Sequence, residues 1–265
     1  MSTDWGKNPK VLLEDEVSLK EDNSSEYVPK NKIYFAFVDV LGFQQTFEEH
    51  RKDNTNEFAQ RYQDVFGYFS RLMNNAKFMQ KRGRDDYVSA AGQTSDSLYF
   101  YTDRIDFLAA FVKIYSHFIL YAMSRDVFFR GGISQGTLFI NKSYQFYGDS
   151  VIKAFLMEST IAKLPRVAID KKTYEELKTF LEGCYFNEEK GRYYIVPFIN
   201  TKLADIAEYY DPIFEFKEIG EEQFRKIEDN NKKNHKKFEF VEGTYQKYDY
   251  LINRFNSSKL KYEKE

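Results

Sequence analysis

Apolar and polar positions along the chain follow two periods, which together predict a mixed α and β protein. Residues 32–40 alternate and then become continuously apolar, which is typical of a buried central strand. Apolar residues recur every three or four positions at 54–77 and at 105–122, so both segments are predicted to be amphipathic helices. Residues 87–101 predict a hairpin broken at 92–95, and residues 127–134 a strand whose hairpin partner lies at 137–140.

This order, β-α-β-β-α-β over residues 32–135, predicts an α+β fold of the ferredoxin-like or palm type. A third helix after Gly148, a strand at 165–170 and a β-rich stretch at 184–199 extend the predicted main domain over residues 31–205. Residues 1–30 are rich in charged and polar residues and predict a loosely ordered arm. Residues 206–265 are more charged and carry aromatic stripes at 221–227 and 245–255, which predicts a C-terminal helical extension.

Composition narrows the range of partners. Lys and Arg number 39 against 41 Asp and Glu, so no general attraction to nucleic acid or anionic lipid is expected. The single cysteine, Cys184, excludes an intramolecular disulfide, and we find neither a signal peptide nor a run approaching the roughly 20 apolar residues of a membrane span. A cytoplasmic location fits best. The three histidines, His50, His117 and His235, lack the spacing of a zinc site.

Two aspartates, Asp39 and Asp96, interrupt or end apolar strands that are predicted to be neighbours. An ionised carboxylate in that setting is costly unless a cation or a set of hydrogen bonds compensates it. Asp39 leads into Leu41, Gly42 and Phe43, where the glycine permits a sharp turn and leaves amide groups near the start of a helix. Two oxygen ligands beside a turn that can hold phosphate indicate Mg²⁺ or Mn²⁺ together with a nucleoside triphosphate.

Each of these residues also has a simpler structural interpretation. Asp39 can be a polar strand end or a helix cap, and the role of Asp96 can be limited to forming a turn. Gly131 and Gly132 are best explained by close packing of a strand against a helix.

Four charged residues, one next to those glycines and three further along the chain, are interpreted structurally as well. Arg130 has the character of a surface or dimer-interface residue, although it remains a candidate for the site. Asp149 is expected to be an N-cap. Glu158 and Arg166 are expected to form an ion pair that orients the third helix.

Four short motifs follow one another along the chain, at residues 37–43 (FVDVLGF), 95–97 (SDS), 129–136 (FRGGISQG) and 147–151 (YGDSV). In their order and approximate spacing the chain resembles the class III nucleotide cyclases, and more narrowly the pyrimidine nucleotide cyclases of bacterial Pycsar antiphage systems. The resemblance covers about residues 32–170. It implies a class III cyclase domain that converts a ribonucleoside triphosphate to a 3′,5′-cyclic monophosphate and pyrophosphate.

The resemblance also implies how the site is built. Asp39 and Asp96 match the carboxylates that hold two divalent ions, and the backbone carbonyl of Val40 matches an additional ligand. Family members act as head-to-tail homodimers with active sites between the subunits, so a homodimer is expected here. A separate effector protein is expected to sense the product.

The chain departs from the family pattern at several positions. Ala90 stands at about the position of the purine-reading lysine, and Gln145 stands near that of its partner aspartate. An amide such as Gln145 is compatible with UTP or CTP without choosing between them. Ile152 and Leu156 replace the asparagine and arginine that steady the transition state. Lys153, Arg130 or Arg166 can supply the missing positive charge.

The sequence therefore predicts a metal-dependent pyrimidine nucleotide cyclase, with UTP slightly preferred over CTP. The alternative is a degenerate cyclase-like domain that binds nucleotide and signals by association without catalysis. A diguanylate-cyclase-like palm enzyme is a weaker competitor, because its Gly-Gly-Asp/Glu-Glu-Phe hairpin is missing from the chain.

Overall fold

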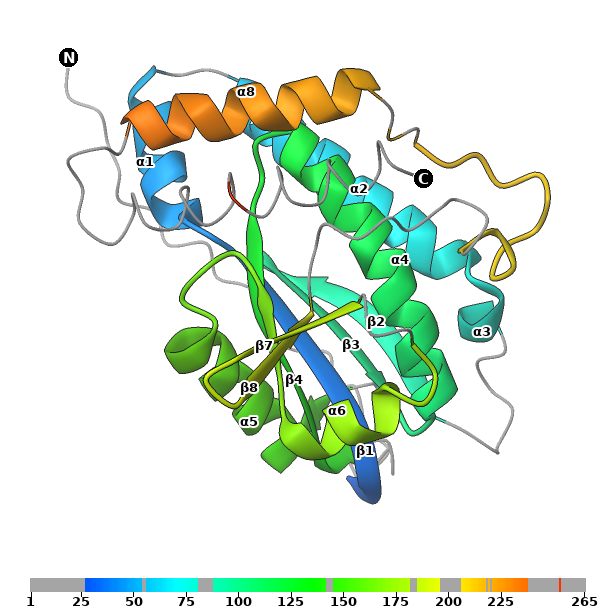
Figure 1. Ribbon diagram of the computed structural model, residues 1–265. Helices are drawn as coiled ribbons and strands as arrows, with labels where there is room; N and C mark the ends of the chain where they lie inside the picture. Colours follow the sequence, from blue (N-terminus) through cyan, green and yellow to red (C-terminus); the bar gives the residue numbers. More distant parts are fainter. Residues whose placement is uncertain are drawn as a thin grey trace, which may run out of the picture.

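The computed structural model describes residues 27–53, 56–80, 88–141, 145–181, 185–195, 206–217, 219, 221–237 and 253 (Figure 1). The helices are α1 (Phe43–Asp53), α2 (Glu57–Asn75), α3 (Lys77–Gln80), α4 (Ile105–Ser124), α5 (Asp149–Leu156), the π-helical turn η2 (Met157–Ile161), α6 (Lys171–Leu177) and α8 (Glu221–Lys237). The strands are β1 (Val28–Val40), β2 (Ser89–Thr94), β3 (Ser97–Thr102), β4 (Phe129–Ile140), β5 (Phe146–Tyr147), β6 (Val167–Ile169), β7 (Phe186–Glu189) and β8 (Arg192–Ile195).

The strands form one open sheet in the order β2-β3-β1-β4-β6-β8-β7, with β5 paired to β4. Strand β1 lies between β3 and β4 and is antiparallel to both, whereas β4 and β6 are parallel. Along the chain β1 is followed by helices, by β2 and β3, by α4 and by β4, and this is the connectivity of a ferredoxin-like unit. The predicted α+β fold is therefore confirmed.

Side-chain alternation along β1 creates a hydrophobic core on each face of the sheet. Tyr34 and Val38 belong to the larger core, which they share with residues of α2 and α4. Those two helices run side by side in Figure 1. Phe35 points to the other face, where it packs in a second core with Ala154 of α5. Asp39 lies an even number of residues after Phe35, so its side chain emerges on the α5 face.

Two details of the predicted strands are wrong. Residues 92–95 do not break the first hairpin: Gly92 pairs with Tyr99 inside continuous β2, and the turn is Ser95–Asp96. A Cβ at Gly92 would collide with the Tyr99 ring, so this glycine serves close packing. Residues 127–134 and 137–140 are not a hairpin either, because β4 is continuous and its hairpin partner is β5.

The first described part of the chain is also more ordered than predicted. Strand β1 begins at Val28 and pairs with β4 from there, with an irregularity between Lys30 and Ile33, so the expected loose arm does not extend to residue 30. Residues 1–26 lie outside the described residues.

The C-terminal helix α8 packs on α4 and on the start of β4. Ile227 is fully buried against Leu120, Met123 and Phe128, and Leu41 of the β1–α1 turn borders the same cluster. Figure 1 shows α8 lying across the ends of α2 and α4.

Asparagine side chains of α8 add hydrogen bonds to this contact. Asn230 Nδ2 donates to the carbonyl of Met123 in the last turn of α4 at 3.1 Å, and Asn234 Nδ2 donates to Asp126 at 2.5 Å. The helix predicted at 221–227 is confirmed, whereas the one predicted at 245–255 lies outside the described residues except for residue 253.

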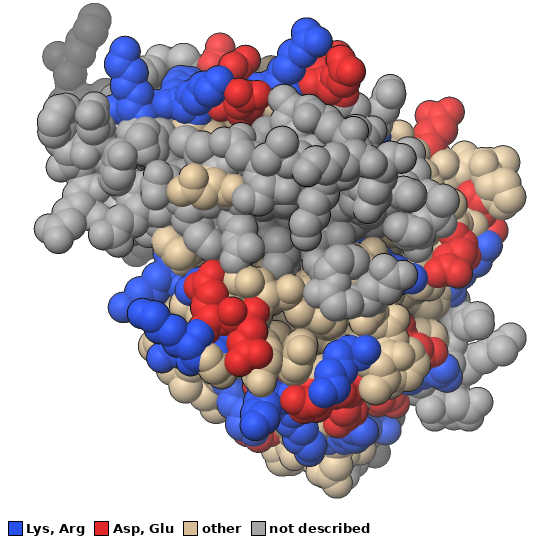
Figure 2. Space-filling model, in the orientation of Figure 1, with Lys and Arg blue, Asp and Glu red and all other residues tan. Residues whose placement is uncertain are grey.

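Helix α4 is the one helix of the described residues that is long and apolar enough to cross a membrane, contrary to the expectation from sequence. Most of its apolar window, 89%, is buried inside the protein, where it contributes to the larger core. On the face shown in Figure 2, acidic and basic side chains are interspersed over the described part of the surface.

Helix α5 and the turn η2 lie directly on β4 because Gly132 has no side chain. A Cβ at this position would lie 2.8 Å from Met157 Cβ and closer than 3.0 Å to the carbonyl oxygen of Ala154. The structural interpretation of the Gly131–Gly132 pair is thus supported at Gly132, where backbone meets backbone.

We expect Gly132→Ala to lower the free energy of unfolding by about 2 kcal/mol, because the added methyl group displaces α5 from the sheet. Gly67→Ala is the control: a Cβ at Gly67 in α2 meets nothing within 4 Å, and alanine favours a helix by up to about 1 kcal/mol. Urea denaturation of both variants measures the difference. A Gly132→Ala protein as stable as Gly67→Ala would contradict the packing described.

His117 is buried on α4 between α2 and the segment that follows residue 206. Its Nε2 lies 2.8 Å from Tyr68 Oη, which in turn accepts a hydrogen bond from the Lys217 amide at 3.0 Å. The Tyr68 hydroxyl can therefore donate to a neutral imidazole. Burial lowers the pKa of His117 to about 4.

Since the ordinary histidine pKa is about 6.5, the unfolded chain takes up a proton at this residue before the folded protein does. The contribution of neutral His117 to the free energy of unfolding is fully present above pH 6.5. It is lost as the pH falls towards 4, and the loss amounts to about 3 kcal/mol in total. Denaturation curves of wild type and His117→Gln between pH 7 and pH 4 test this expectation, because glutamine keeps an acceptor but does not titrate. Parallel pH profiles for the two proteins would contradict it.

Candidate active site

The structure brings Asp39 and Asp96 together at one end of the sheet. Asp39 is the second-last residue of β1, where it pairs with Ser97 of β3 on one side and with Arg130 of β4 on the other. Asp96 precedes Ser97 in the β2–β3 turn, and its carbonyl accepts a 3.2 Å hydrogen bond from the Val40 amide. The two aspartates are therefore attached to backbone segments that contact each other.

Asp39 is partly buried and lies near a second negative charge, that of Asp96. Burial raises the pKa of the Asp39 carboxyl above its usual range, and the nearby charge of Asp96 raises it further. Ser97 Oγ, which donates to Asp39 Oδ1 at 2.8 Å, and the Arg130 guanidinium act in the opposite direction. The carboxylate is partly stabilised by these groups and would gain from a further positive charge.

Glu158 is a third acidic residue near this pair, and its role was missed from the sequence. Its side chain is only 4% exposed, and its Oε1 lies 2.5 Å from Arg130 Nε. Burial raises the pKa of Glu158, the Arg130 charge lowers it, and the charges of Asp39 and Asp96 raise it further. The predicted Glu158–Arg166 ion pair is not formed. Glu158 pairs with Arg130 instead, and Arg166 pairs with Glu189 at 2.5 Å.

The turn between β1 and α1 is built around Gly42, whose φ of +76° lies in the left-handed region that favours glycine. The Leu41 amide is bound to the Phe128 carbonyl at 2.8 Å, so neither it nor the Val40 amide points to a ligand. The amides of the first turn of α1, which begins at Phe43, have no intrahelical acceptor by the geometry of a helix. Thr46 closes the turn by donating to the Gly42 carbonyl at 3.0 Å.

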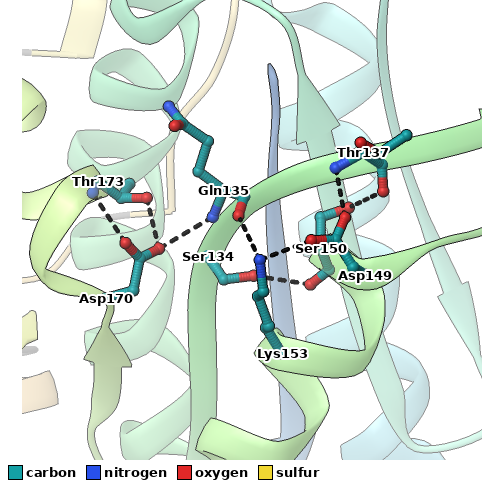
Figure 3. Close-up of polar contacts among 8 residues, drawn as sticks. All are labelled: Ser134, Gln135, Thr137, Asp149, Ser150, Lys153, Asp170 and Thr173. Atoms are coloured by element: carbon teal, nitrogen blue, oxygen red, sulfur yellow. Dashed lines mark hydrogen bonds and ion pairs between the residues drawn. The ribbon is translucent and has the colours of Figure 1, made fainter. Parts of the chain in front are cut away.

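Lys153 and Asp149 lie in a different polar network, shown in Figure 3. Lys153 Nζ is 2.6 Å from Asp149 and 3.5 Å from the Gln135 carbonyl. Gln135 pairs with Tyr34, five residues before Asp39 on β1, which places it about 16 Å along the sheet from the acidic pair. Within one chain Lys153 is therefore not part of the cluster around Asp39.

Asp149 itself is not the N-cap that was predicted. Gly148 holds that position, and Asp149 is the first residue of α5, where its carboxylate accepts from the Thr137 amide.

Gln145 lies at the far end of β4 from Arg130. Its Oε1 accepts from Asn141 Nδ2 at 2.8 Å, and its amide donates to Asn141 Oδ1 at 2.9 Å. Asn141 follows the end of β4 and lies eleven positions after Arg130, which corresponds to about 35 Å of extended chain. One chain alone thus keeps Gln145 well away from Asp39.

A groove of about 380 Å³ lies between α2 and the β2–β3 turn, and Ser95, the residue before Asp96, is part of its lining. Its lining includes aromatic residues of α1 and α2 and polar residues of the hairpin: Phe43, Phe58, Tyr62, Phe66, Gln93 and Ser95. The sequence predicts the aromatic residues of α2 only as the apolar stripe of an amphipathic helix, whereas Phe43 belongs to the turn predicted to hold phosphate. Burial raises the pKa of the Tyr62 hydroxyl; the Arg61 charge lowers it, and the charges of Asp126, Asp96 and Asp39 raise it further.

Oxygen donors dominate the cluster at the end of β1. In the described part of the chain, no group of three or more histidine, cysteine or acidic side chains is arranged to hold a metal ion. Two carboxylates are, however, sufficient for Mg²⁺, which usually completes its shell with water and substrate phosphate oxygens. The donor set at Asp39 and Asp96 fits such an ion.

Known proteins share sequence and structural features with this chain. The sequence model described as "Adenylate and Guanylate cyclase catalytic domain" matches residues 26–197. No curated protein matches the chain.

Among solved structures, the chain is similar to the catalytic core of a rhodopsin-guanylyl cyclase with converted specificity in complex with ATPalphaS, with 16% identity and a TM-score of 0.42 over 64% of this chain and 98% of the other. It is also similar to a class III adenylyl cyclase-like ATP-binding protein from Pseudomonas aeruginosa, with 12% identity and a TM-score of 0.48 over 70% of this chain and 41% of the other. Because the family match spans well over half of the 265 residues, the chain belongs to the adenylate and guanylate cyclase catalytic domain family.

Proposed function

We propose that this protein is a pyrimidine nucleotide cyclase, which converts UTP or CTP to the 3′,5′-cyclic monophosphate and pyrophosphate. The observation that carries the proposal is the meeting of Asp39 and Asp96 through the Val40–Asp96 backbone hydrogen bond. Family membership supports nucleotide cyclisation, whereas the choice of a pyrimidine and a role in antiphage defence rest on the resemblance of the motifs. In that role a separate effector would sense the cyclic nucleotide.

Class III cyclases generally use two divalent metal ions, and the residues present fit this requirement. Asp39 and Asp96 would hold the ions, with the Val40 carbonyl as a further oxygen ligand. The ions, Mg²⁺ or Mn²⁺, would acidify the ribose 3′-hydroxyl and withdraw charge from the triphosphate.

The protein's own groups orient the substrate. The first amides of α1 point outward from a helix N-terminus, which favours phosphate oxygens. Arg130, next to Asp39 in the sheet, supplies a guanidinium that can bind two phosphate oxygens at once. Binding in this way would hold the α-phosphate in line with the attacking hydroxyl, so no protein base is required.

Two positions favour a pyrimidine over a purine. Ala90, at about the position of the family's purine-reading lysine, is 4% exposed and apolar. Gln145 offers an amide, which has both a donor and an acceptor for a pyrimidine edge. UTP is the first substrate to test, although this pair of residues accommodates CTP equally well.

A complete site requires a second copy of the chain. Arg130 and Gln145 lie at opposite ends of β4, so two chains placed head to tail would bring the acidic pair of one to Gln145 of the other. Helix α5 presents an apolar surface suited to this contact, because Ile152, Phe155 and Leu156 are 60%, 51% and 49% exposed. We therefore propose a homodimer with active sites between its subunits.

The alternative function is nucleotide binding without catalysis. It is favoured by Ile152 and Leu156, which are exposed and apolar where the family has transition-state residues. Such a protein would still bind a metal-bound triphosphate at Asp39 and Asp96 and would signal by association.

We expect purified protein with Mn²⁺ to form a cyclic product from UTP or CTP, and Asp39→Asn or Asp96→Asn to reduce the rate by at least about 10³-fold, because each substitution removes a charged ligand. Product formation from each of the four nucleoside triphosphates, measured separately by chromatography, checks this expectation.

Each other outcome has a definite meaning. Product from ATP alone would refute the pyrimidine assignment. Calorimetric binding of UTP without pyrophosphate release would favour the non-catalytic alternative. Full activity in both aspartate variants would refute the site itself.

The proposed dimer is tested with a matched pair of isoleucines. Ile152→Glu should convert the dimer to a monomer in sedimentation and abolish turnover, since it places a charge in an apolar contact. Ile213→Glu is the control, because Ile213 is 90% exposed and lies far along the chain from α5. Unchanged sedimentation of Ile152→Glu would argue against a contact at α5.

A further inference from the structure

Arg130 lies between two carboxylates at unequal distances. Its Nε is 2.5 Å from Glu158 Oε1, whereas its terminal nitrogen is 3.9 Å from Asp39 Oδ2. The guanidinium thus forms its short ion pair with Glu158 through Nε and only approaches Asp39 with a terminal nitrogen. Asp39 keeps its short hydrogen bond from Ser97.

Burial explains why Arg130 is held on the Glu158 side. The Glu158 side chain is 4% exposed, compared with 21% for Asp39 and 27% for Arg130. A buried carboxylate depends on a paired cation more strongly than one that water still reaches. The arginine is therefore drawn towards the deeper of the two acids.

The local fold places Glu158 at the required depth. Gly132, two residues after Arg130 on β4, lets the backbone of α5 and η2 approach the strand. The π-helical turn Met157–Ile161 then carries Glu158 at its second position, where the side chain reaches back to Arg130.

We propose that Glu158 is a positioning residue that draws Arg130 away from Asp39 and so leaves the Asp39 carboxylate free for a divalent cation. This inference rests on the proposed function, because it takes Asp39 as a metal ligand. Without the Glu158 charge, Asp39 is the carboxylate that the same guanidinium already approaches at 3.9 Å. An ion pair between them would have to break before a cation could bind.

The test measures Mn²⁺ binding in the absence of nucleotide, through the loss of the free-ion signal in electron paramagnetic resonance. We expect Glu158→Gln to raise the Mn²⁺ dissociation constant by about tenfold. This is the change expected if the fraction of molecules in which Asp39 is free to bind the ion falls to about a tenth. The double variant Glu158→Gln/Arg130→Gln should return within about twofold of wild type, because the competing cation is gone. A purely structural role for Glu158 would not produce this rescue.

Glu189→Gln is the matched control. It removes the carboxylate charge from the Arg166–Glu189 pair, which has the same 2.5 Å separation but lies on the β7 edge of the sheet. Its Mn²⁺ affinity should equal that of wild type. Glu158→Asp serves if glutamine prevents folding, because it keeps the charge but shortens the reach, and about threefold weaker Mn²⁺ binding is expected.

The possible failures are distinguishable. Wild-type affinity in Glu158→Gln, or no rescue in the double variant, overturns the role of Glu158 while leaving cyclase activity in place. Wild-type protein that binds Mn²⁺ but forms no cyclic product overturns the proposed function alone. Wild-type protein that binds no Mn²⁺ overturns both.

Discussion

The register of three adjacent strands is the constraint on which the candidate site depends. Pairing of β1 with β3 and β4 places Asp39 level with Ser97 and Arg130, and the Val40 amide fixes the β2–β3 turn that carries Asp96. A shift of one residue in β1 would turn Asp39 to the opposite face of the sheet. The two hydrophobic cores prevent that shift, because it would also reverse every core side chain of the strand.

Much of this arrangement could be predicted from local sequence. The 3.6-residue periodicity of α2 and α4 and the apolar run of β1 are strong signals, and they were sufficient for the ferredoxin-like order. The acidic pair was also accessible, because Asp39 and Asp96 each stand next to an apolar strand, where a charge is unusual. Their relative placement followed from the predicted hairpin rather than from either residue alone.

The remaining features depend on contacts between distant segments, which local patterns do not encode. Arg130 and Glu158 are 28 residues apart, and their pairing requires the close approach permitted at Gly132. The sequence predicts a break at Gly92 because glycine often marks one, whereas in the structure this glycine accommodates the Tyr99 ring. The groove between α2 and the β2–β3 turn could not be predicted for a similar reason. An aromatic stripe on α2 indicates that these side chains are buried, but it does not show where their burial is incomplete.

Helix α8 shows that the family match and the structural unit have different limits. The match ends at residue 197, yet Ile227 covers the apolar end of α4, and the cluster to which it belongs borders Leu41, two residues after Asp39. A fragment trimmed to the matched region would expose that surface to water and leave Met123 without the hydrogen bond from Asn230. Excised or chimeric forms of this catalytic domain therefore need to include the chain through residue 237.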